Sequence, residues 1–512
     1  MREAYRVDAV RAAEQALMST LPDGTLMARA AAGLAATCVA LLAGGRPGFV
    51  YGARVTVLAG SGDNGGDALY AGALLARRGA RVTAIAPGGR LHAGGATALR
   101  AAGGRIRREV PGSLDGPDLV IDGMLGIGGH GGLREPFVAL CSLAAAARAS
   151  MATVVAVDLP SGIDADTGVV DGPAVQADVT VTFGTLKPGL LIDPGAGQAG
   201  TVELVDIGLG SLLREVAAGP AARAPQHADI AALLPRPGAE SDKYRRGVAG
   251  LLAGSDKYSG AVVLSTGGAI RGGAGMVRVV TAPSAAAAVR QAWPEVILTP
   301  FDQLPGGDPV AAGRVQAWIA GPGMGTTDDA AERLASVLAA DVPVLVDADG
   351  LTLLAGPLKA AARARAGRGT PTLITPHAGE LARLLGGDTD AGRIAAHRLE
   401  HARRAAEELG CTVLLKGSTT VIASPGQDTV LVNPTGTPWL ATAGSGDVLS
   451  GLAGSLLAQG LPPAGAAIAG AYLHGLAARL AAGGPGDAAA EAPIGAFDVV
   501  RSLPDAIRAV GG

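Results

Sequence analysis

VTVLAGSGDNGGD, residues 55–67, is a β-branched run that leads directly into a glycine-rich loop. The apolar part has the composition of a buried strand, and the sequence after Asp67 is typical of a helix that ends near Gly79. Glycines let the backbone turn tightly between the two, and the helix start offers unpaired N–H groups to a phosphate. The stretch therefore predicts a strand–loop–helix unit with an anion-binding loop.

Similar units continue along the whole chain, which at 512 residues is too long for one ordinary core. Helical segments are expected at residues 3–18 and 28–42, and a connector at residues 211–225 breaks the alternation. The expected strands are residues 55–59, 81–86, 118–122, 153–158, 178–183, 201–206, 248–253, 276–280, 316–320, 343–347, 372–375, 412–416 and 429–432. This pattern predicts an α/β protein of two domains, 1–220 and 221–512, each a mostly parallel sheet flanked by helices. The second closes on two long helices, residues 447–459 and 464–482.

Composition narrows the class of protein. Hydrophobic residues make up 48% of the chain, and its net charge of −3 lacks the basic excess that nucleic acids or membrane surfaces attract. The most apolar run, residues 30–45, is predicted to be a buried helix because it is shorter than a membrane span. No signal peptide, disulfide framework or zinc site is expected. We therefore expect a cytoplasmic, soluble protein that binds neither nucleic acid nor membranes.

Lysine is rare, since only five of the 42 basic residues are lysine: Lys187, Lys243, Lys257, Lys359 and Lys416. Arginine occupies the other basic positions. A retained lysine reflects either chance or a role that needs a compact ammonium ion, such as phosphate contact or proton transfer.

Two further strands of the first half end in carboxylates, Asp122 and Asp158, where ligands bind in open parallel sheets. Each precedes a glycine-rich turn, and the simple alternative is that each caps a helix or a turn. A dinucleotide-binding dehydrogenase would carry an acidic residue about 20 positions after its glycines. None occurs between Asp67 and Glu109, which argues against hydride transfer.

These motifs together resemble the YjeF N-terminal domain, the NAD(P)H-hydrate epimerase family, over residues 9–208; its specific parts are Asn-Gly-Gly-Asp at 64–67 and Val-Asp-Leu-Pro-Ser-Gly-Ile-Asp at 157–164. The resemblance implies a Rossmann-like domain and a potassium site of Asn64, Asp122 and Ser161, whose oxygen donors suit a hard cation. It implies substrate contacts by Asn64, Gly65, Gly66, Asp67, Ala68, Gly126, Ile127, Gly128, Gly129, His130, Gly131, Gly132 and Asp158. Asp158 and Lys187 are the candidates for the proton transfers that open and re-form the hydrated ring.

The most specific stretch of the second half is ATAGSGD, residues 441–447, which leads into an apolar helix of small residues. Its glycines place backbone N–H groups at a helix start, where they stabilise charge that develops on a phosphoryl group. Asp447 then stands at the phosphate end, able to take a proton from an attacking hydroxyl. The simpler alternative is a helix N-cap.

With six further clusters in order, this stretch resembles the ribokinase-like fold and, more narrowly, the ADP- or ATP-dependent NAD(P)H-hydrate dehydratase family, over residues 226–503. The clusters are residues 254–260, 271–275, 321–325, 347–351, 375–380 and 416–420. The resemblance implies that Asp447 is the catalytic base and contacts the hydrated nucleotide with Ala253, Gly323 and His377. Lys416, Gly417, Ser418, Thr419, Thr420 and Gly446 would hold the adenine nucleotide. A lone histidine is commonly structural, but the place of His377 just after a strand favours binding.

The two resemblances predict an enzyme that epimerises R and S hydrates of NADH or NADPH and dehydrates the S form, converting ADP to AMP and phosphate. ADP rather than ATP is expected because fused enzymes of this type are typical of bacteria. Mg²⁺ is expected to bind with the nucleotide. We also expect the protein to form a homo-oligomer. One alternative is a small-molecule kinase of the hydroxyethylthiazole type with a YjeF-type binding or regulatory domain, because Asp447 would serve it equally well. Another is a non-enzymatic scaffold, which need not keep Asn64, Asp122, Asp158 and Lys187.

Overall fold

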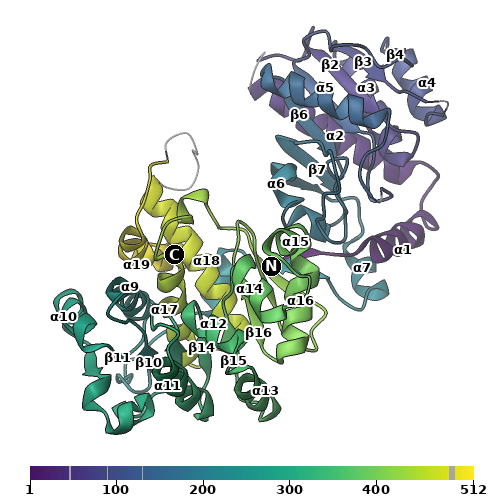
Figure 1. Cartoon of the computed structure of the whole chain (residues 1–512). Helices are drawn as coiled ribbons and strands as arrows, with labels where there is room; N and C mark the ends of the chain where they lie inside the picture. Colours follow the sequence, from purple (N-terminus) through teal and green to yellow (C-terminus); the bar gives the residue numbers. More distant parts are fainter. Residues whose placement is uncertain (45–47, 89, 130, 484–490, 512) are drawn as a thin grey trace. The chain divides into compact units, whose positions relative to one another are not determined.

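Two mostly parallel sheets, each flanked by helices, organise the computed structural model of the chain (Figure 1). The structure describes residues 1–44, 48–88, 90–129, 131–483 and 491–511. It separates into one unit of Glu3–Ala222 and a second of Arg223–Gly512 together with Met1–Arg2. The predicted α/β class, with mostly parallel sheets and flanking helices, is confirmed.

The unit Glu3–Ala222 contains a seven-stranded sheet of order β4-β3-β2-β5-β6-β7-β8, in which all neighbours run parallel. Its strands are β2 (Arg54–Ala59), β3 (Arg81–Ile85), β4 (Arg105–Arg107), β5 (Leu119–Gly123), β6 (Thr153–Val157), β7 (Val179–Phe183) and β8 (Thr201–Val205). Its helices are α1 (Val7–Met18), α2 (Thr25–Gly44), α3 (Asp63–Arg77), α4 (Ala93–Ala101), α5 (Phe137–Ala149), α6 (Ala196–Ala199) and α7 (Gly210–Val216). Because the strand order reverses between β2 and β5, the loops that follow these strands diverge where ligands usually bind.

The second sheet has the order β1-β9-β18-β17-β16-β15-β14-β13-β10-β11-β12. Its strands are β1 (Arg2–Ala4), β9 (Ala222–Ala224), β10 (Val248–Leu252), β11 (Met276–Thr281), β12 (Ile297–Pro300), β13 (Ala317–Ala320), β14 (Val344–Val346), β15 (Thr372–Ile374), β16 (Thr412–Leu415), β17 (Thr420–Ala423) and β18 (Val430–Asn433). The strands from β12 to β16 are parallel, whereas β17 is antiparallel to both β16 and β18. The strand order reverses here between β10 and β13.

The helices of the second unit are α8 (His227–Leu233), α9 (Ser259–Arg271), α10 (Pro283–Ala292), α11 (Asp328–Ala339), α12 (Asp349–Ala355), α13 (Lys359–Gly367), α14 (Ala378–Leu385), α15 (Ala391–Ala396), α16 (Arg398–Leu409), α17 (Ser445–Ala458), α18 (Pro463–Ala482) and α19 (Ala496–Gly511). Helices α17 and α18 match the two predicted closing helices to within two residues at each end. A third closing helix, α19, was not predicted. Its buried residues Val499, Val500 and Leu503 join the core of the second unit, so tertiary packing stabilises it.

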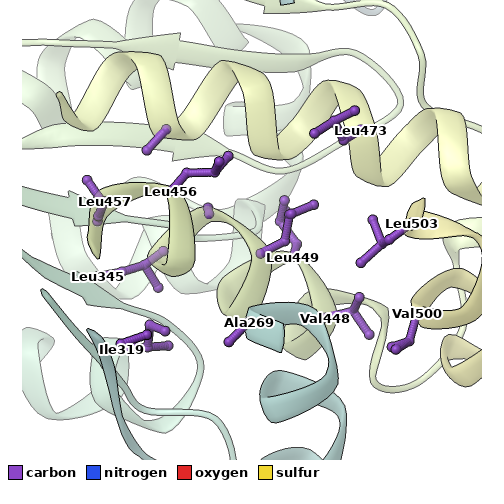
Figure 2. Packing of buried hydrophobic residues seen from close by; sticks show 14 of the residues in the cluster. Ala269, Ile319, Leu345, Val448, Leu449, Leu456, Leu457, Leu473, Val500 and Leu503 are labelled. Atoms are coloured by element: carbon purple, nitrogen blue, oxygen red, sulfur yellow. The ribbon is translucent and has the colours of Figure 1, made fainter. Parts of the chain in front are cut away.

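Helix α17 lies unusually close to α9, because small residues face each other across the contact. A Cβ built on Gly451 would lie 1.9 Å from the carbonyl oxygen of Ser265, so only glycine permits this approach. The remaining side chains of α17 fill the core with residues of β13, β14, α18 and α19, among them Val448, Leu449, Leu456, Ile319, Leu345, Leu473 and Leu503 (Figure 2). Each fully buried leucine contributes roughly 1.5–3 kcal/mol. This packing holds the first turn of α17, which carries Asp447, against the sheet.

Helix α2 corresponds to the predicted buried helix but is longer than expected. It spans 20 residues and satisfies the length and composition of a membrane-crossing helix, which the predicted run of residues 30–45 did not. One face is buried in the core of the first unit, through Ala30, Ala31, Leu34, Ala35, Cys38 and Leu42. On the sheet side, a Cβ on Gly33 would lie 2.5 Å from Val205 of β8, so the helix rests directly on the strand.

The helix predicted at residues 3–18 is wrong at its start. Residues 2–4 form β1, and α1 begins only at Val7. The reason is backbone pairing: the N–H of Tyr5 donates to the carbonyl of Leu186, and the carbonyl of Ala4 accepts from Ala221. These bonds need an extended backbone, which overrides the helical composition of the segment.

Candidate functional site

Asp122 and Ser161 meet at the carboxyl ends of β5 and β6. The side-chain oxygen of Ser161 donates to Asp122 Oδ1 at 2.7 Å, and the N–H of Ser161 donates to Asp122 Oδ2 at 2.8 Å. Asp122 is fully buried, and burial raises its pKa to about 6, although hydrogen bonds from Ser161 and Met124 oppose the shift. The pair is therefore a rigid, oxygen-rich group beneath the loop that leaves β5.

Asn64 lies in the first turn of α3, and its side chain lies beside Gly126 of the loop that leaves β5. A Cβ on Gly126 would lie 2.9 Å from Asn64 Oδ1, and the N–H of the neighbouring Leu125 donates to Ser161 Oγ at 2.9 Å. The side-chain nitrogen of Asn64 is buried without a hydrogen-bond partner among the described residues. The atoms that could hold a cation here are oxygens: the side-chain carbonyl of Asn64, the carboxylate of Asp122 and the hydroxyl of Ser161. The structure thus gathers all three residues of the predicted potassium site around one loop.

Asp158 and Lys187 form a buried ion pair. The ammonium group of Lys187 lies 2.5 Å from Asp158 Oδ1 and also contacts Thr182 Oγ1 at 3.0 Å and the Phe183 carbonyl at 3.1 Å. The Lys187 side chain is only 1% exposed. Asp158 has a φ of +65°, a conformation that a non-glycine residue adopts at a cost and that is concentrated at functional sites. The two candidates for proton transfer are therefore in direct contact.

Further carboxyl groups surround this pair. Burial raises the pKa of Asp67 to about 8, and the charges of Asp158, Asp63 and Glu14 add to the shift. Burial likewise raises the pKa of Glu14, although the positive charge of Lys187 opposes the shift. Sequence reasoning missed Asp63 and Glu14. A signal existed for Glu14, because it lies seven residues after Val7 and four after Val10, on the buried face of α1.

Two cavities adjoin these residues. One of about 800 Å³ lies between α1, α2 and α3 and is lined by Glu14, Asp63, Asp67, Tyr70, His92 and Phe183 among others. A smaller one of about 250 Å³ lies between the glycine-rich loop after β5 and the turn after β6, lined by Gly126, Gly129, Gly131, Gly132, Ile163 and Asp164 among others. Four of the predicted substrate residues thus line one small cavity.

The other predicted substrate residues of the first unit are more dispersed. Gly65, Gly66 and Ala68 are buried in the first turns of α3, and Gly65 lies against the backbone of Gly60. Ile127 packs against the hydrophobic core. Predicted residue His130 lies outside the described residues.

In the second unit, Asp447 stands in the first turn of α17. Its helix starts after Gly444, whose φ of +86° needs the freedom of glycine. Burial raises the pKa of Asp447 to about 7, and Asp347 adds to the shift while Lys416 opposes it. His474 of α18 fixes the helix start, since its Nε2 lies 2.9 Å from the carbonyl oxygen of Ser445. Burial lowers the pKa of His474 to about 4, which keeps the ring neutral at physiological pH.

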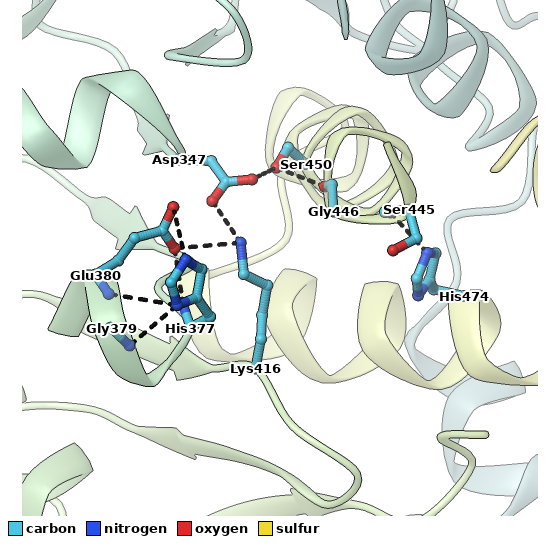
Figure 3. A network of polar contacts seen from close by, with 9 residues as sticks. All are labelled: Asp347, His377, Gly379, Glu380, Lys416, Ser445, Gly446, Ser450 and His474. Carbon is cyan, nitrogen blue, oxygen red and sulfur yellow. Dashed lines mark hydrogen bonds and ion pairs between the residues drawn. The ribbon is translucent and has the colours of Figure 1, made fainter. Parts of the chain in front are cut away.

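A network of charges joins this helix to the predicted nucleotide loop (Figure 3). Lys416 Nζ lies 2.7 Å from Asp347 Oδ1 and 3.6 Å from Glu380, and Ser450 donates to Asp347 Oδ2 at 2.5 Å. A Cβ on Gly446 would lie 3.5 Å from Lys416 Nζ, so the first turn of α17 faces the ammonium group. Burial lowers the pKa of Lys416, but the two carboxylates outweigh burial and the pKa is raised. The structure therefore brings Lys416, Gly446 and Asp447 together and adds Asp347, which was not predicted as a site residue.

His377 caps helix α14. Its Nδ1 accepts from the N–H groups of Gly379 at 3.0 Å and Glu380 at 3.4 Å, while the Glu380 carboxylate accepts from the N–H of His377 at 2.8 Å. This capping box is the structural role that the sequence left as an alternative. More than half of the His377 side chain is exposed beside Glu380, so substrate contact stays a prediction.

The remaining predicted residues lie at loop starts. Ala253 follows β10, and the loop after it is tied to the loop after β13, because the N–H of Gly254 donates to the carbonyl of Pro322. Gly323 has a φ of +61°, and a Cβ there would lie 2.8 Å from Tyr258 and Ala261. In the Lys416 loop, Gly417 lies against the Arg398 guanidinium, Gly417 and Ser418 are exposed, Thr419 is half-buried, and Thr420 is buried as the first residue of β17.

The fold and the two sites define a two-unit α/β enzyme with acid–base groups at the carboxyl ends of parallel strands. Family models agree: residues 249–493 match the model described as NAD(P)H-hydrate dehydratase, and residues 23–189 match the YjeF-related protein N-terminus. The chain is 48% identical to the bifunctional NAD(P)H-hydrate repair enzyme of Mycobacterium leprae, with 100% of both chains covered. It is 49% identical to that of Mycobacterium tuberculosis, with 91% of each covered. The chain belongs to the family of bifunctional NAD(P)H-hydrate repair enzymes.

Among solved structures, the ADP/ATP-dependent NAD(P)H-hydrate dehydratase from Bacillus subtilis, co-crystallised with ATP/Mg²⁺, is 30% identical. The match covers 56% of this chain and 97% of the Bacillus subtilis chain, with a TM-score of 0.48. The relatives named above confirm the predicted family and enzyme class.

Proposed function

We propose that the unit Glu3–Ala222 interconverts the R and S hydrates of NADH and NADPH, and that the unit Arg223–Gly512 dehydrates the S form with ADP, giving AMP and phosphate. The full-length identity of 48% to a protein named for this repair activity carries the proposal. The buried Asp158–Lys187 pair and the placement of Asp447 at the start of α17 support it chemically.

Epimerisation needs the bond between C6 and the ring nitrogen to break and re-form on the opposite face. One group of the Asp158–Lys187 pair takes the proton of the C6 hydroxyl, and the other delivers a proton to the ring nitrogen, which opens the ring to an aldehyde. The reverse transfers close it with either configuration. A pair in contact at 2.5 Å can exchange these protons without help from bulk water.

The potassium proposal rests on Asn64, Asp122 and Ser161. A potassium ion held there would supply a fixed positive charge beside the loop that leaves β5. Ser161 and Asp122 already fix each other through two hydrogen bonds, so their oxygens are preorganised, and Asn64 Oδ1 lies beside Gly126 of the same loop. The glycine residues of the 126–132 loop would then hold the substrate next to this site.

In the second unit Asp447 takes the proton of the C6 hydroxyl as its oxygen attacks the β-phosphoryl group of ADP, and AMP leaves. The ring nitrogen then expels phosphate from C6, and loss of a proton from C5 restores the dihydropyridine. Lys416 and the N–H groups at the start of α17 stabilise the charge on the transferring phosphoryl group. A magnesium ion bound with the nucleotide would neutralise further phosphate charge.

The small-molecule kinase is the second candidate, because phosphoryl transfer to any hydroxyl would use Asp447 in the same way. Product analysis separates the two. The protein is incubated with S-NADPH hydrate, ADP and Mg²⁺, and NADPH, AMP and free phosphate are quantified. Equal amounts of all three are expected. A phosphorylated product that accumulates without NADPH would identify a kinase.

Location and assembly are part of the same proposal. We expect a cytoplasmic homo-oligomer whose partners are NADHX, NADPHX and ADP. Sedimentation of the purified chain at several concentrations tests the assembly, and a single monomeric species at every concentration would contradict it.

A further inference from the structure

Helix α1 is anchored on the same loops that carry the proposed epimerase residues, although the sequence did not assign it to the site. The N–H of Val7, at the helix start, donates to Asp166 Oδ1 at 2.8 Å, in the loop that continues from Ser161. Two residues earlier, the N–H of Tyr5 donates at 3.0 Å to the carbonyl of Leu186, the residue next to Lys187. The position of α1 is therefore fixed by the segments that position Ser161 and Lys187.

Two charged residues of α1 point toward these loops. Arg11 and Glu14 are three residues apart and so share one face of the helix. A Cβ on Gly128, in the middle of the glycine-rich loop after β5, would lie 3.4 Å from Arg11 Nη2. Arg11 thus places a guanidinium group beside Gly128 of this loop.

Glu14 lines the cavity of about 800 Å³ together with Asp63, Asp67 and Phe183. Phe183 connects the cavity to the proton-transfer pair, because its N–H approaches Asp158 Oδ1 at 3.4 Å and its carbonyl accepts from Lys187 at 3.1 Å. The cavity therefore extends from Glu14 of α1 to Phe183, whose backbone contacts both Asp158 and Lys187.

The charge balance of this region favours a ligand rather than a purely structural cluster. Asp63 and Asp158 act electrostatically on both Glu14 and Asp67, whereas the cations Lys187 and Arg11 act on Glu14. Burial raises the pKa of both Glu14 and Asp67, and Asp67 Oδ1 is buried without a partner among the described residues. Carboxyl groups in this state pair well with an amide, which both donates and accepts hydrogen bonds.

We propose that helix α1 forms one wall of the epimerase substrate site, with Arg11 contacting a phosphate of the hydrated nucleotide and Glu14 hydrogen-bonding its nicotinamide carboxamide. This inference rests on the proposed epimerase function. Arginine presents a planar fork that matches two phosphate oxygens, and the backbone at Gly128 can add a further contact. Glu14, one turn further along α1, orients the ring against Asp158 and Lys187.

The test uses the full chain with R-NADPH hydrate as the only substrate and with ADP, Mg²⁺ and K⁺ in excess. Absorbance at 340 nm then reports epimerisation, after subtraction of the rate without protein. Arg11→Gln should raise KM about tenfold with little change in kcat, the cost of one charge-assisted hydrogen bond. Glu14→Ala should raise KM and lower kcat, whereas Glu14→Gln, which keeps a hydrogen-bonding group, should recover most of the loss.

Matched controls are Arg100→Gln, at an exposed position of α4, and Glu109→Ala, at an exposed position after β4. Dehydration of S-NADPH hydrate, measured on every variant, should stay at the wild-type rate. If the wild-type chain does not convert the R hydrate, the proposed epimerase function itself fails. If the wild type converts it but Arg11→Gln and Glu14→Ala behave like the controls, the role of α1 is refuted. Loss of S-hydrate dehydration as well would assign α1 a structural role and also refute it.

Discussion

Ser450, three residues after Asp447, donates a 2.5 Å hydrogen bond to Asp347, whose other carboxylate oxygen lies 2.7 Å from Lys416. One buried carboxylate therefore joins the helix that carries the proposed base to the loop proposed to hold the nucleotide. Asp347 is 1% exposed, so its charge acts on both through a medium of low dielectric.

Asn in place of Asp347 should shift the pH dependence of dehydration. The Asp347 charge is the largest electrostatic influence that raises the pKa of Asp447, so Asp347→Asn should lower that pKa and move the acidic limb of the kcat profile to lower pH. The measurement is S-NADPH hydrate dehydration from pH 5 to 9. Asp341→Asn, at an exposed position, is the control and should leave the profile in place.

Asp447 itself should give a rate that declines as the pH falls. Its pKa is raised to about 7, so the carboxylate needed to accept a proton is present above this pH and is lost below it. In the wild type, kcat for dehydration should therefore fall through this range, and Asp447→Asn should lower kcat roughly 10²–10⁴-fold at every pH. An Asp447→Asn variant with a kcat close to that of the wild type would exclude Asp447 as the base.

Lys187→Met should damage both folding and epimerisation. Removing one partner of a buried ion pair leaves an uncompensated charge, which costs roughly 3–5 kcal/mol of stability. In Lys187→Met the uncompensated charge is that of Asp158, which also acts on Glu14 and Asp67. Asp158→Asn should abolish epimerisation and also lower stability, because the buried ammonium group of Lys187 loses its ion-pair partner. Urea unfolding and R-hydrate conversion are measured together, with exposed Arg100→Met as control. Normal epimerisation by Asp158→Asn would remove Asp158 from the mechanism.

Epimerisation should depend on potassium. Replacing KCl by choline chloride at equal ionic strength should lower the rate, and Asn64→Ala or Ser161→Ala should raise the KCl concentration needed for half-maximal rate. Dehydration of the S hydrate serves as the internal control because it uses the other unit. A rate of R-hydrate conversion that is independent of KCl would contradict the proposed ion site.

Much of the site geometry was predictable because chemistry and topology coincide in parallel sheets. Asp122 and Asp158 end buried β-branched runs, and parallel strands end at the same edge, so a shared sheet edge followed from position in the chain. The association of Asp122 with Ser161, and of Asp158 with Lys187, was expected only from the family resemblance. Asp447 was similarly marked by glycines before an apolar helix.

Other parts depend on contacts between distant segments, which carry no local signal. The strand at residues 2–4 exists because Leu186 and Ala221 pair with the backbone there. Asp347 was read as part of a glycine-rich cluster, and only the approach of Ser450, 103 residues later, shows its bridging position. Short strands such as β4 and β12 are defined by neighbours more than by composition.

The most direct test of the two-unit enzyme is absorbance at 340 nm after the protein is added to a mixture of R- and S-NADPH hydrates with ADP, Mg²⁺ and K⁺. We predict complete recovery of NADPH, the S fraction rapidly and the R fraction through epimerisation. Recovery of the S fraction alone would contradict the epimerase half of the proposal. No recovery with either ADP or ATP would contradict the repair function as a whole.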